Sequence, residues 1–288
     1  MQGILRLVWQ LTEIGLQSSF AAGLQKVIHM RFAKFLAVFL VWGAGTAAAA
    51  TCGNDASGFE AWKAQFAPIA KSAGIGGSGL SALAGTRYST GTIYADRHQK
   101  SFHLSLSEFM RVRGASAIVA RGRGQKAANA ALFASLEARY GVPAGPLIAI
   151  WGMETAFGAL SGNQNTISAV TTLAYDCRRH EYFTEQLMAA LKLVDKGVLS
   201  SSSVGAMHGE VGQTQFLPKN ILAYGLGGSL NNKANALAST ANYLRAHGWK
   251  AGAGYQPGQP NFAAIQAWNA ARVYEEAIAI IGKQIDGN

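Results

Sequence analysis

Apolar residues return every three to four positions along several segments of the chain, which is the spacing of an amphipathic α-helix. These segments are residues 58–72, 126–140, 147–157, 181–196 and 235–247. Each is long enough for about three or four helical turns. We therefore predict five helices that bury their apolar faces in a common core.

Residues that favour helix ends stand at the borders of these segments. Glycine, which readily takes the left-handed conformation that ends a helix, follows three of them: Gly141, Gly197 and Gly248. Pro146 fits the first turn of the helix over 147–157. Asn269 is placed to cap a last helix that reaches Gly282. These positions sharpen the predicted helix boundaries.

The rest of the chain shows no pattern for a large sheet. Residues 74–97 are rich in glycine and contain short β-prone pieces such as 92–94, and residues 107–119 favour no single element. No strand-like alternation is sustained, and no internal repeat is visible. We predict a mainly α (α+β) fold in one domain over 51–288, with at most a small sheet or a helical insertion.

The first 50 residues have the layout of a secretory signal peptide. Basic residues precede an eight-residue apolar run over 35–42, and small residues follow up to Ala50. We place the cleavage after Ala50, where a small-x-small pattern ends. The alternatives are a buried helix or a short anchor, although the run is short for a membrane span. Residues 1–29 precede a second methionine and are interpreted as an overlong start.

The net charge of the chain indicates which classes of partner it can bind. The 288-residue chain is 49% hydrophobic, which excludes a disordered protein. Removal of residues 1–50 leaves 21 basic and 14 acidic side chains, a net charge of +7. A basic exported protein suits an anionic polymer such as a cell wall, or a membrane surface. Nucleic acid is disfavoured because no run of Lys and Arg exceeds two residues and export removes that partner.

The chain has only two cysteines, Cys52 and Cys177. Two are too few for a disulfide-dense scaffold or a cysteine-based zinc site. In an oxidising compartment they can form one bridge, which would tie the mature N-terminus to the middle of the chain. The alternative is lipidation of Cys52, although Thr51 stands where a smaller residue is expected. We favour the disulfide.

One carboxylate lies in a strongly apolar helical segment. The same-face neighbours of Glu154 are Leu147, Ile150, Trp151 and Phe157. Burial among such side chains disfavours the charged form and raises the pKa of a carboxyl group, which can then act as a general acid near neutral pH. The alternative is a boundary carboxylate that reaches water or pairs with an arginine.

The loop over 205–220 combines glycines with amide side chains. The glycines allow a ligand to approach the backbone, and residues 213–215 offer donors and acceptors that suit sugar hydroxyls. The alternative is an ordinary turn before a helix. Glu210 in this loop is a candidate second carboxylate, which we interpret as a residue that fixes the loop.

Five stretches of the chain resemble the lytic murein transglycosylase B family in its order and spacing. They are residues 140–165, 173–183, 209–220, 241–249 and 268–282. Weaker likeness extends over nearly all of residues 57–283. The resemblance implies a lysozyme-like helical catalytic domain.

The resemblance also implies an activity. Such enzymes cleave the β-1,4 bond between N-acetylmuramic acid and N-acetylglucosamine in peptidoglycan without water, leaving a 1,6-anhydromuramoyl end. Glu154 matches the catalytic glutamate. It would protonate the glycosidic oxygen, then take the proton of the C6 hydroxyl that attacks the anomeric carbon, with help from the N-acetyl carbonyl. One carboxyl serves both steps, so the usual glycosidase pair is not needed.

Individual residues of the chain match substrate-binding positions of the family. Gln215 matches a glutamine that contacts substrate near the acid, and Tyr243 matches a tyrosine of the saccharide groove. Asn269 matches the asparagine of a C-terminal Tyr-Asn pair in which Trp268 here replaces the tyrosine. The replacement keeps an aromatic face for stacking and loses a phenolic hydroxyl.

Two neighbouring arginines complete the implied binding set. Arg178 and Arg179 match an arginine pair at the groove edge, suited to substrate carboxylates. The alternative is surface ion pairing. We expect a periplasmic monomer that acts on glycan strands; the sequence names no partner from the cell-wall synthesis or secretion machinery.

The chain departs from the family pattern in the glycine-rich loop. Ala206 stands where a serine often bonds the catalytic glutamate, and Glu210 and Val211 replace a common Ala-Met. Residues 225–238 contain no acid, where some members bind calcium, so we predict no calcium. The histidines form no HExxH motif and no His–Cys cluster, so we predict no catalytic metal and no cofactor.

Two other functions stay open. The first is a lysozyme-type hydrolase that uses the same Glu154 on the same polymer. The second is a non-catalytic wall-binding scaffold on an inherited enzyme fold. The intact motif around Glu154 favours the transglycosylase.

Overall fold

A computed structural model of the protein describes residues 50–98 and 104–287, and the predicted signal segment over 1–49 lies outside them. Within the described residues the chain forms thirteen α-helices. They are α1 Phe59–Ser72, α2 Gly77–Ala84, α3 Thr90–Arg97, α4 Leu106–Val112, α5 Ala115–Ala128, α6 Ala130–Tyr140, α7 Ala144–Thr155, α8 Thr166–Tyr175, α9 His180–Asp195, α10 Pro218–Tyr224, α11 Lys233–Ala246, α12 Phe262–Trp268 and α13 Arg272–Asp286. A 3-10 turn, η1 (Ala56–Gly58), precedes α1.

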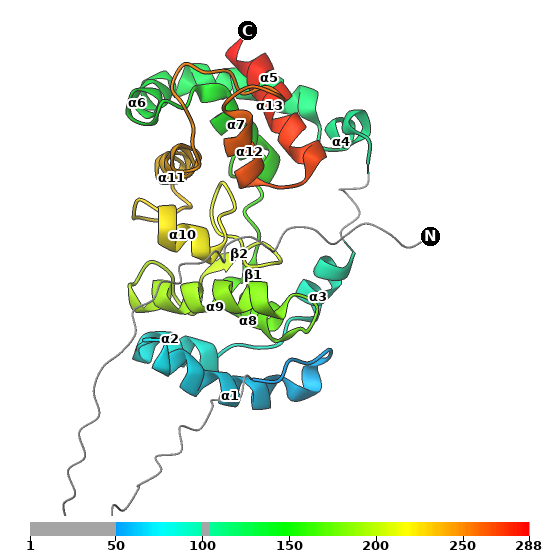
Figure 1. The fold of residues 1–288 in the computed structure, drawn as a ribbon, viewed down its shortest axis with the longest axis vertical. Helices are drawn as coiled ribbons and strands as arrows, with labels where there is room; N and C mark the ends of the chain where they lie inside the picture. The colour runs from blue at the N-terminus through cyan, green and yellow to red at the C-terminus, as the bar shows by residue number, and fades with distance from the viewer. Residues whose placement is uncertain (1–49, 99–103, 288) are drawn as a thin grey trace, which may run out of the picture. The chain divides into compact units, whose positions relative to one another are not determined.

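The helices pack in two groups (Figure 1). One group is built on the α8–α9 pair, against which α1, α2 and α3 pack. The other is built on the α7–α13 pair, with α4, α5 and α12 beside it. Helices α10 and α11 connect the groups, because α10 contacts α9 and α11 contacts α12. The loops that join α7 to α8 and α9 to α10 run between the groups.

The sheet is as small as the sequence predicts. Strand β1 (Gln164–Asn165) pairs antiparallel with β2 (Val204–Gly205) in the register Gln164↔Gly205. The pair fixes the start of the glycine-rich loop next to the α7–α8 connection. The predicted mainly α fold with a small sheet is therefore confirmed.

Helix α7 lies at the centre of its group. Every one of its residues except Glu154 is buried. This explains why the segment is apolar on all sides rather than on one face, since a helix surrounded by others needs no polar face. The predicted helices over 58–72, 181–196 and 235–247 correspond to α1, α9 and α11, and glycine follows α6 and α9 in the left-handed conformation.

The expectation of β-prone pieces in 74–97 is wrong, because the structure forms α2 and α3 there. Asp195 at the end of α9 accepts hydrogen bonds from the backbone amides of Gly76 (2.6 Å) and Gly79 (2.7 Å). This carboxylate satisfies the free amides at the start of α2, a partner that local sequence does not reveal. Ser89 caps α3 through the amide of Thr92.

Two predicted boundaries also need correction. A single helix over 126–140 does not form, because Asn129 breaks the chain into α5 and α6. Asn269 does not cap a helix that reaches Gly282. Its backbone is extended, its Oδ1 accepts from the amide of Ala271 (3.0 Å), and α13 runs from Arg272 to Asp286.

The predicted disulfide is confirmed. Cys52 and Cys177 are bonded, with their Cα atoms 5.0 Å apart. The amide of Gly53 donates to the Tyr175 carbonyl (3.0 Å), and the amide of Cys177 donates to the Gly53 carbonyl (3.2 Å). The bridge thus holds the first described residues against the end of α8, and it uses the sulfur that lipidation of Cys52 would need.

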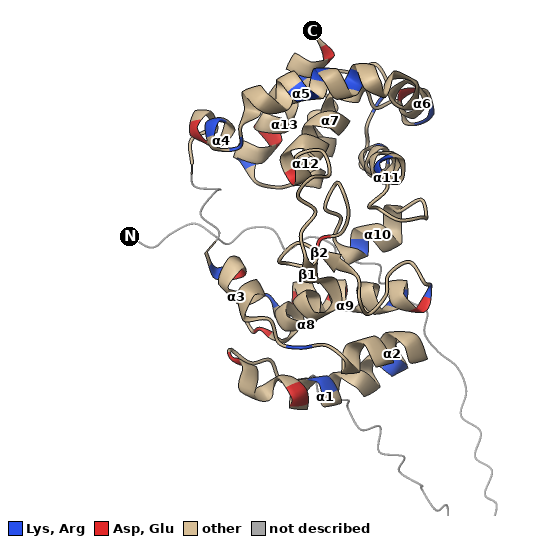
Figure 2. Cartoon of the chain, turned by 180° about the vertical axis from the view of Figure 1, so that it is seen from behind, with Lys and Arg blue, Asp and Glu red and all other residues tan. Residues whose placement is uncertain are grey.

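Among the described residues, no helix combines the length and apolarity required to span a membrane. Basic side chains occur on helices of both groups, including α3, α5 and α10 (Figure 2). The positive charge is therefore distributed over the fold and not confined to one helix.

Candidate active site

The C-terminal end of α7 carries Glu154 and turns sharply after Thr155. Ala156 and Phe157 both have positive φ, 49° and 65°. Non-glycine residues adopt this left-handed conformation infrequently and at a cost in free energy, so surrounding contacts must hold it. Such outliers often accompany functional sites.

Hydrogen bonds join this helix end to the glycine-rich loop. The Thr155 hydroxyl donates to the Gln213 carbonyl (2.6 Å) and accepts from the amide of Gly158 (2.9 Å). The indole of Trp151 donates to Gln213 Oε1 (2.8 Å). The end of α7 and the loop therefore form one rigid piece around Glu154.

Two neutral donors from distant elements meet one oxygen of Glu154. The hydroxyl of Tyr274 on α13 donates to Oε1 at 2.6 Å, and the indole Nε1 of Trp268 at the end of α12 donates to the same atom at 3.2 Å. Among the described residues, Oε2 has no hydrogen-bond partner. One carboxyl oxygen is thus held by the protein, and the other can carry a proton toward a substrate.

Burial raises the pKa of Glu154 from its ordinary 4.5 to about 7. The hydrogen bonds from Tyr274 and Trp268 stabilise the carboxylate and lower the pKa, as does the charge of Arg113. The negative charge of Glu210 raises it. A carboxyl group with a pKa near the working pH can both give and take a proton, which is the requirement for an acid that later acts as a base.

Glu154 opens onto a cavity of about 210 Å³. The cavity is lined by Glu154, Ala206, Glu210, Gln215, Phe216, Leu217, Asn220, Trp268 and Asn269. These residues come from α7, the glycine-rich loop, α10, the end of α12 and the α12–α13 connection. The structure therefore brings four of the predicted residues, Glu154, Gln215, Trp268 and Asn269, to one place.

Trp268 is held by other aromatic rings. Its ring meets Phe216 edge to face at 5.1 Å and Tyr243 at 5.2 Å between centroids. The Tyr243 hydroxyl donates to the Ala267 carbonyl (2.6 Å) at the end of α12. Tyr243 is buried, so it lies behind Trp268 and fixes that side chain. Its predicted place in the saccharide groove stays a prediction.

Gln215 is held in a strained conformation at the cavity wall. Its φ is +55°, and its side-chain amide donates to the Gly212 carbonyl at 2.7 Å. Reciprocal backbone bonds between Val211 and Phe216 (2.8 and 3.0 Å) close the loop around it. The loop thus directs position 215 into the cavity.

Arg178 and Arg179 lie apart from this cavity. Both form ion pairs with the buried carboxylate of Asp96, and Arg178 Nε donates to Asp96 Oδ2 at 2.7 Å. Neither arginine lines the cavity of Glu154. The ion pairing given as the alternative is thus present, and recognition of substrate carboxylates stays a prediction.

Sequence reasoning missed Tyr274. This residue lies in the last of the matching stretches, on the buried face of α13. Burial and the nearby Glu154 charge raise the pKa of its hydroxyl far above the usual range, so it acts only as a donor. A buried tyrosine hydroxyl needs a hydrogen-bond partner. This requirement is the signal by which Tyr274 could have been found.

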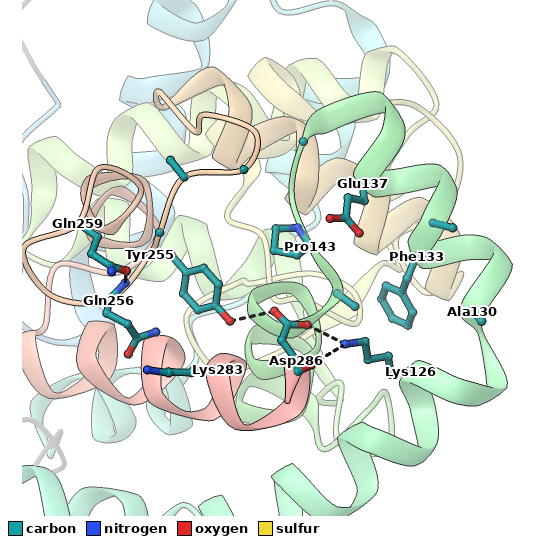
Figure 3. Close-up of a pocket in the computed structure, with 16 residues that line it drawn as sticks. Lys126, Ala130, Phe133, Glu137, Pro143, Tyr255, Gln256, Gln259, Lys283 and Asp286 are labelled. Atoms are coloured by element: carbon teal, nitrogen blue, oxygen red, sulfur yellow. Dashed lines mark hydrogen bonds and ion pairs between the residues drawn. The ribbon is translucent and has the colours of Figure 1, made fainter. Parts of the chain in front are cut away.

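A larger cavity, about 660 Å³, lies elsewhere, between α5, α6, α13 and the 252–259 loop (Figure 3). The partly buried carboxylate of Asp286 accepts hydrogen bonds from Lys126 Nζ (3.0 Å), Tyr255 Oη (2.9 Å) and the Gly145 amide (2.9 Å). Since these contacts already satisfy Asp286, the cavity floor is a structural clamp and not a reactive centre.

The sequence profile described as "Transglycosylase SLT domain" matches residues 58–259, which is more than half of the chain. The chain belongs to this family. A curated relative, the membrane-bound lytic murein transglycosylase B of Escherichia coli (strain K12), is 33% identical over 137 residues. The match covers 42% of the chain, and the chain spans 38% of the length of that relative.

Solved structures of similar proteins share this fold. SltB3 from Pseudomonas aeruginosa, solved in complex with NAG-NAM-pentapeptide, is 28% identical with a TM-score of 0.73, over 80% of each chain. Soluble lytic transglycosylase SltB1 from Pseudomonas aeruginosa is 21% identical with a TM-score of 0.70, over 78% of this chain and 98% of the other. At 21% identity, the similarity to SltB1 shows only that the two proteins share a fold. The SLT-domain protein is thus a mainly helical, lysozyme-like member of its family.

Proposed function

We propose that this SLT-domain protein is a peptidoglycan lytic transglycosylase that uses Glu154 as acid and then as base. It cleaves the β-1,4 bond between N-acetylmuramic acid and N-acetylglucosamine and leaves a 1,6-anhydromuramoyl end. The observation that carries the proposal is the Glu154 carboxyl at the cavity, held by two neutral donors, with a pKa of about 7.

The two steps follow from the two oxygens of Glu154. The neutral acid donates its proton to the glycosidic oxygen from Oε2, the oxygen that faces no protein donor, and the bond to the anomeric carbon breaks. The resulting carboxylate is stabilised on Oε1 by Tyr274 and Trp268. It then accepts the proton of the C6 hydroxyl as that oxygen attacks the anomeric carbon. The group ends as it began, protonated.

Family membership and the complex of SltB3 with NAG-NAM-pentapeptide support a glycan-strand substrate. The cavity walls suit a sugar, because Trp268 offers aromatic surface while Gln215, Asn220 and Asn269 offer amides. The rival hydrolase keeps one observation in its favour, since a second carboxylate, Glu210, lines the same cavity. A paired carboxylate is what a hydrolytic glycosidase uses.

Product analysis tests the proposal directly. Purified wild type and Glu154→Gln are incubated with peptidoglycan sacculi, and the released muropeptides are analysed by mass. Wild type should yield anhydro ends, and Glu154→Gln should lose about 10³-fold or more in rate, since one group serves both proton transfers. Free reducing ends from wild type would establish the hydrolase, and unchanged turnover by the variant would reject Glu154 as the acid.

We further infer that the protein works in the periplasm. The predicted signal segment and the Cys52–Cys177 disulfide support this location, because structural disulfides persist in oxidising compartments. Fractionation of expressing cells should find the mature chain in the periplasmic fraction. A purely cytoplasmic protein with reduced cysteines would contradict the inference.

A further inference from the structure

Glu210 is a carboxylate of the active-site cavity that the single-acid mechanism leaves without a role. It lines the same 210 Å³ cavity as Glu154, and its side chain is 24% exposed. The negative charge of Glu210 raises the pKa of Glu154. Its place in the cavity calls for a chemical role as well as the structural one predicted from the sequence.

A tight turn aims this side chain. The Gly209 amide donates to the Ala206 carbonyl (3.1 Å), and the Ala206 amide donates to the Glu210 carbonyl (2.9 Å). Gly209 has a φ of +88°, where an added Cβ would lie 2.2 Å from Val170. An added Cβ at Gly205 would lie 1.9 Å from the Glu210 carbonyl oxygen. The close packing leaves the carboxylate little freedom to move.

The carboxylate is also held in its charged form. Burial alone would raise the pKa of Glu210, but hydrogen bonds and charge from His208 outweigh burial and lower it. The amide of His208 donates to Oε2 (3.0 Å), and the His208 ring lies 3.3 Å from Oε1. Arg179 and Tyr182 are further groups that interact with its charge. The cavity therefore holds an ionised carboxyl beside one whose pKa is raised into the neutral range.

We propose that Glu210 stabilises the positively charged intermediate by accepting a hydrogen bond from the N–H of the substrate's acetamido group. The inference rests on the proposed function. It makes Glu210 a second carboxylate of the reaction without making it a base for water.

Glu154 gives its proton to the glycosidic oxygen, the C1–O bond breaks toward that oxygen, and the acetamido carbonyl oxygen bonds to C1. The positive charge then rests on the ring that contains the acetamido N–H, and the Glu210 carboxylate faces that N–H. Attack of the C6 hydroxyl oxygen on C1 opens this ring, restores the neutral amide and returns the proton to Glu154.

Kinetics of Glu210→Gln and Glu210→Asp test this proposal on the same glycan strands. Glu185→Gln is the matched control, because Glu185 is an exposed glutamate that pairs with Lys219 on the surface. Glu210→Gln keeps the shape and removes the charge, so kcat should fall by about 100-fold while KM changes little. Glu210→Asp keeps the charge and should recover part of the loss.

Two further readouts separate this role from loop fixing. The thiazoline derived from N-acetylmuramic acid resembles the cyclic intermediate, so Glu210→Gln should bind it more weakly with little change in product affinity. The alkaline limb of the pH–rate profile should move to lower pH, because a charge that raises the pKa of Glu154 is gone. Apart from Glu210, the groups that act on the pKa of Glu154, and thus on this limb, are Tyr274, Trp268 and Arg113.

The proposal fails if Glu210→Gln has wild-type kcat and thiazoline affinity. It also fails if Glu210→Gln and Glu210→Asp lose kcat equally and both have a lower melting temperature. That pattern would show that Glu210 only fixes the loop. If wild type gives anhydro ends and Glu154→Gln is inactive, either failure leaves the transglycosylase proposal intact. If Glu154→Gln stays active, the transglycosylase proposal itself fails.

Discussion

The two ends of the α7–α13 pair each place a carboxyl group between the same two helices, with opposite results. At one end Asp286 accepts from Lys126, Tyr255 and the amide of Gly145. At the other end lies Glu154, nine residues along α7 from Gly145 and thus about 14 Å away. Its hydrogen-bond donors among the described residues are Tyr274 and Trp268. Asp286 and Glu154 are both acidic residues between the same two helices, and they differ in the hydrogen-bond donors that they meet.

The difference shows how the surroundings distinguish a structural carboxylate from the carboxyl that we propose as the acid. Asp286 has donors on both oxygens and an ammonium group in contact. It therefore clamps the first turn of α7 to the last turn of α13. Glu154 has neutral donors on one oxygen, and the residue lines a cavity. Burial raises its pKa to about 7, so this carboxyl keeps its proton to a higher pH than an ordinary glutamate does.

The largest effect on stability should come from the clamp. Asp286→Ala leaves Lys126 and the Gly145 amide without their partner, so the free energy of unfolding should fall by about 2–4 kcal/mol. Denaturant unfolding measures the change, and turnover by the folded enzyme should stay close to wild type. Glu185→Ala is the control, because its surface pair with Lys219 is worth less than about 1 kcal/mol. An equal, small loss in both variants would show that Asp286 is no clamp.

The next largest effect should be a pH-dependent difference in stability between wild type and Glu154→Gln. Its pKa is raised from 4.5 to about 7 in the folded state, so its neutral form is favoured there. Wild type therefore loses stability as pH rises through that window, whereas Glu154→Gln does not. The variant should gain about 1–3 kcal/mol relative to wild type between pH 4 and pH 8. A difference in unfolding free energy that stays constant over this range would mean that Glu154 titrates as an ordinary surface acid.

The smallest effect should come from the neutral donor at the reactive end. Tyr274→Phe removes the 2.6 Å bond that stabilises the Glu154 carboxylate. We expect roughly a tenfold loss of kcat. Because that bond lowers the pKa of Glu154, the alkaline limb of the pH–rate profile should move to higher pH. This shift is opposite to that expected for Glu210→Gln.

Tyr94→Phe is the matched control for this prediction, because Tyr94 is 67% exposed on α3. It should leave both rate and profile unchanged. If Tyr274→Phe likewise left the alkaline limb in place, Tyr274 would be a packing residue and the contrast between the two ends would weaken.

Local patterns predicted the helices that bury a continuous apolar face, such as α1, α9 and α11. They failed at α2, whose free amides are capped by Asp195 from α9, more than a hundred residues away. They also failed at Asn129 and Asn269, where the chain bends. At α2 and at Asn129 a distant side chain, Asp195 or Lys233, takes part in the local hydrogen bonding. The hydrogen bonds of Asn269 are local, to Ala271 and Ile265.

The amino-acid sequence by itself determined the carboxyl at position 154, its apolar helix, the cysteine pair and the amide-rich loop, because these depend on residue type and spacing. Tertiary structure alone decided which groups meet that carboxyl. Tyr274 and Trp268 reach Glu154 across more than a hundred residues, and a tight turn brings Glu210 to the same cavity. The physical reason is that a pKa depends on burial and on nearby charges and donors, and only the packed chain sets those distances.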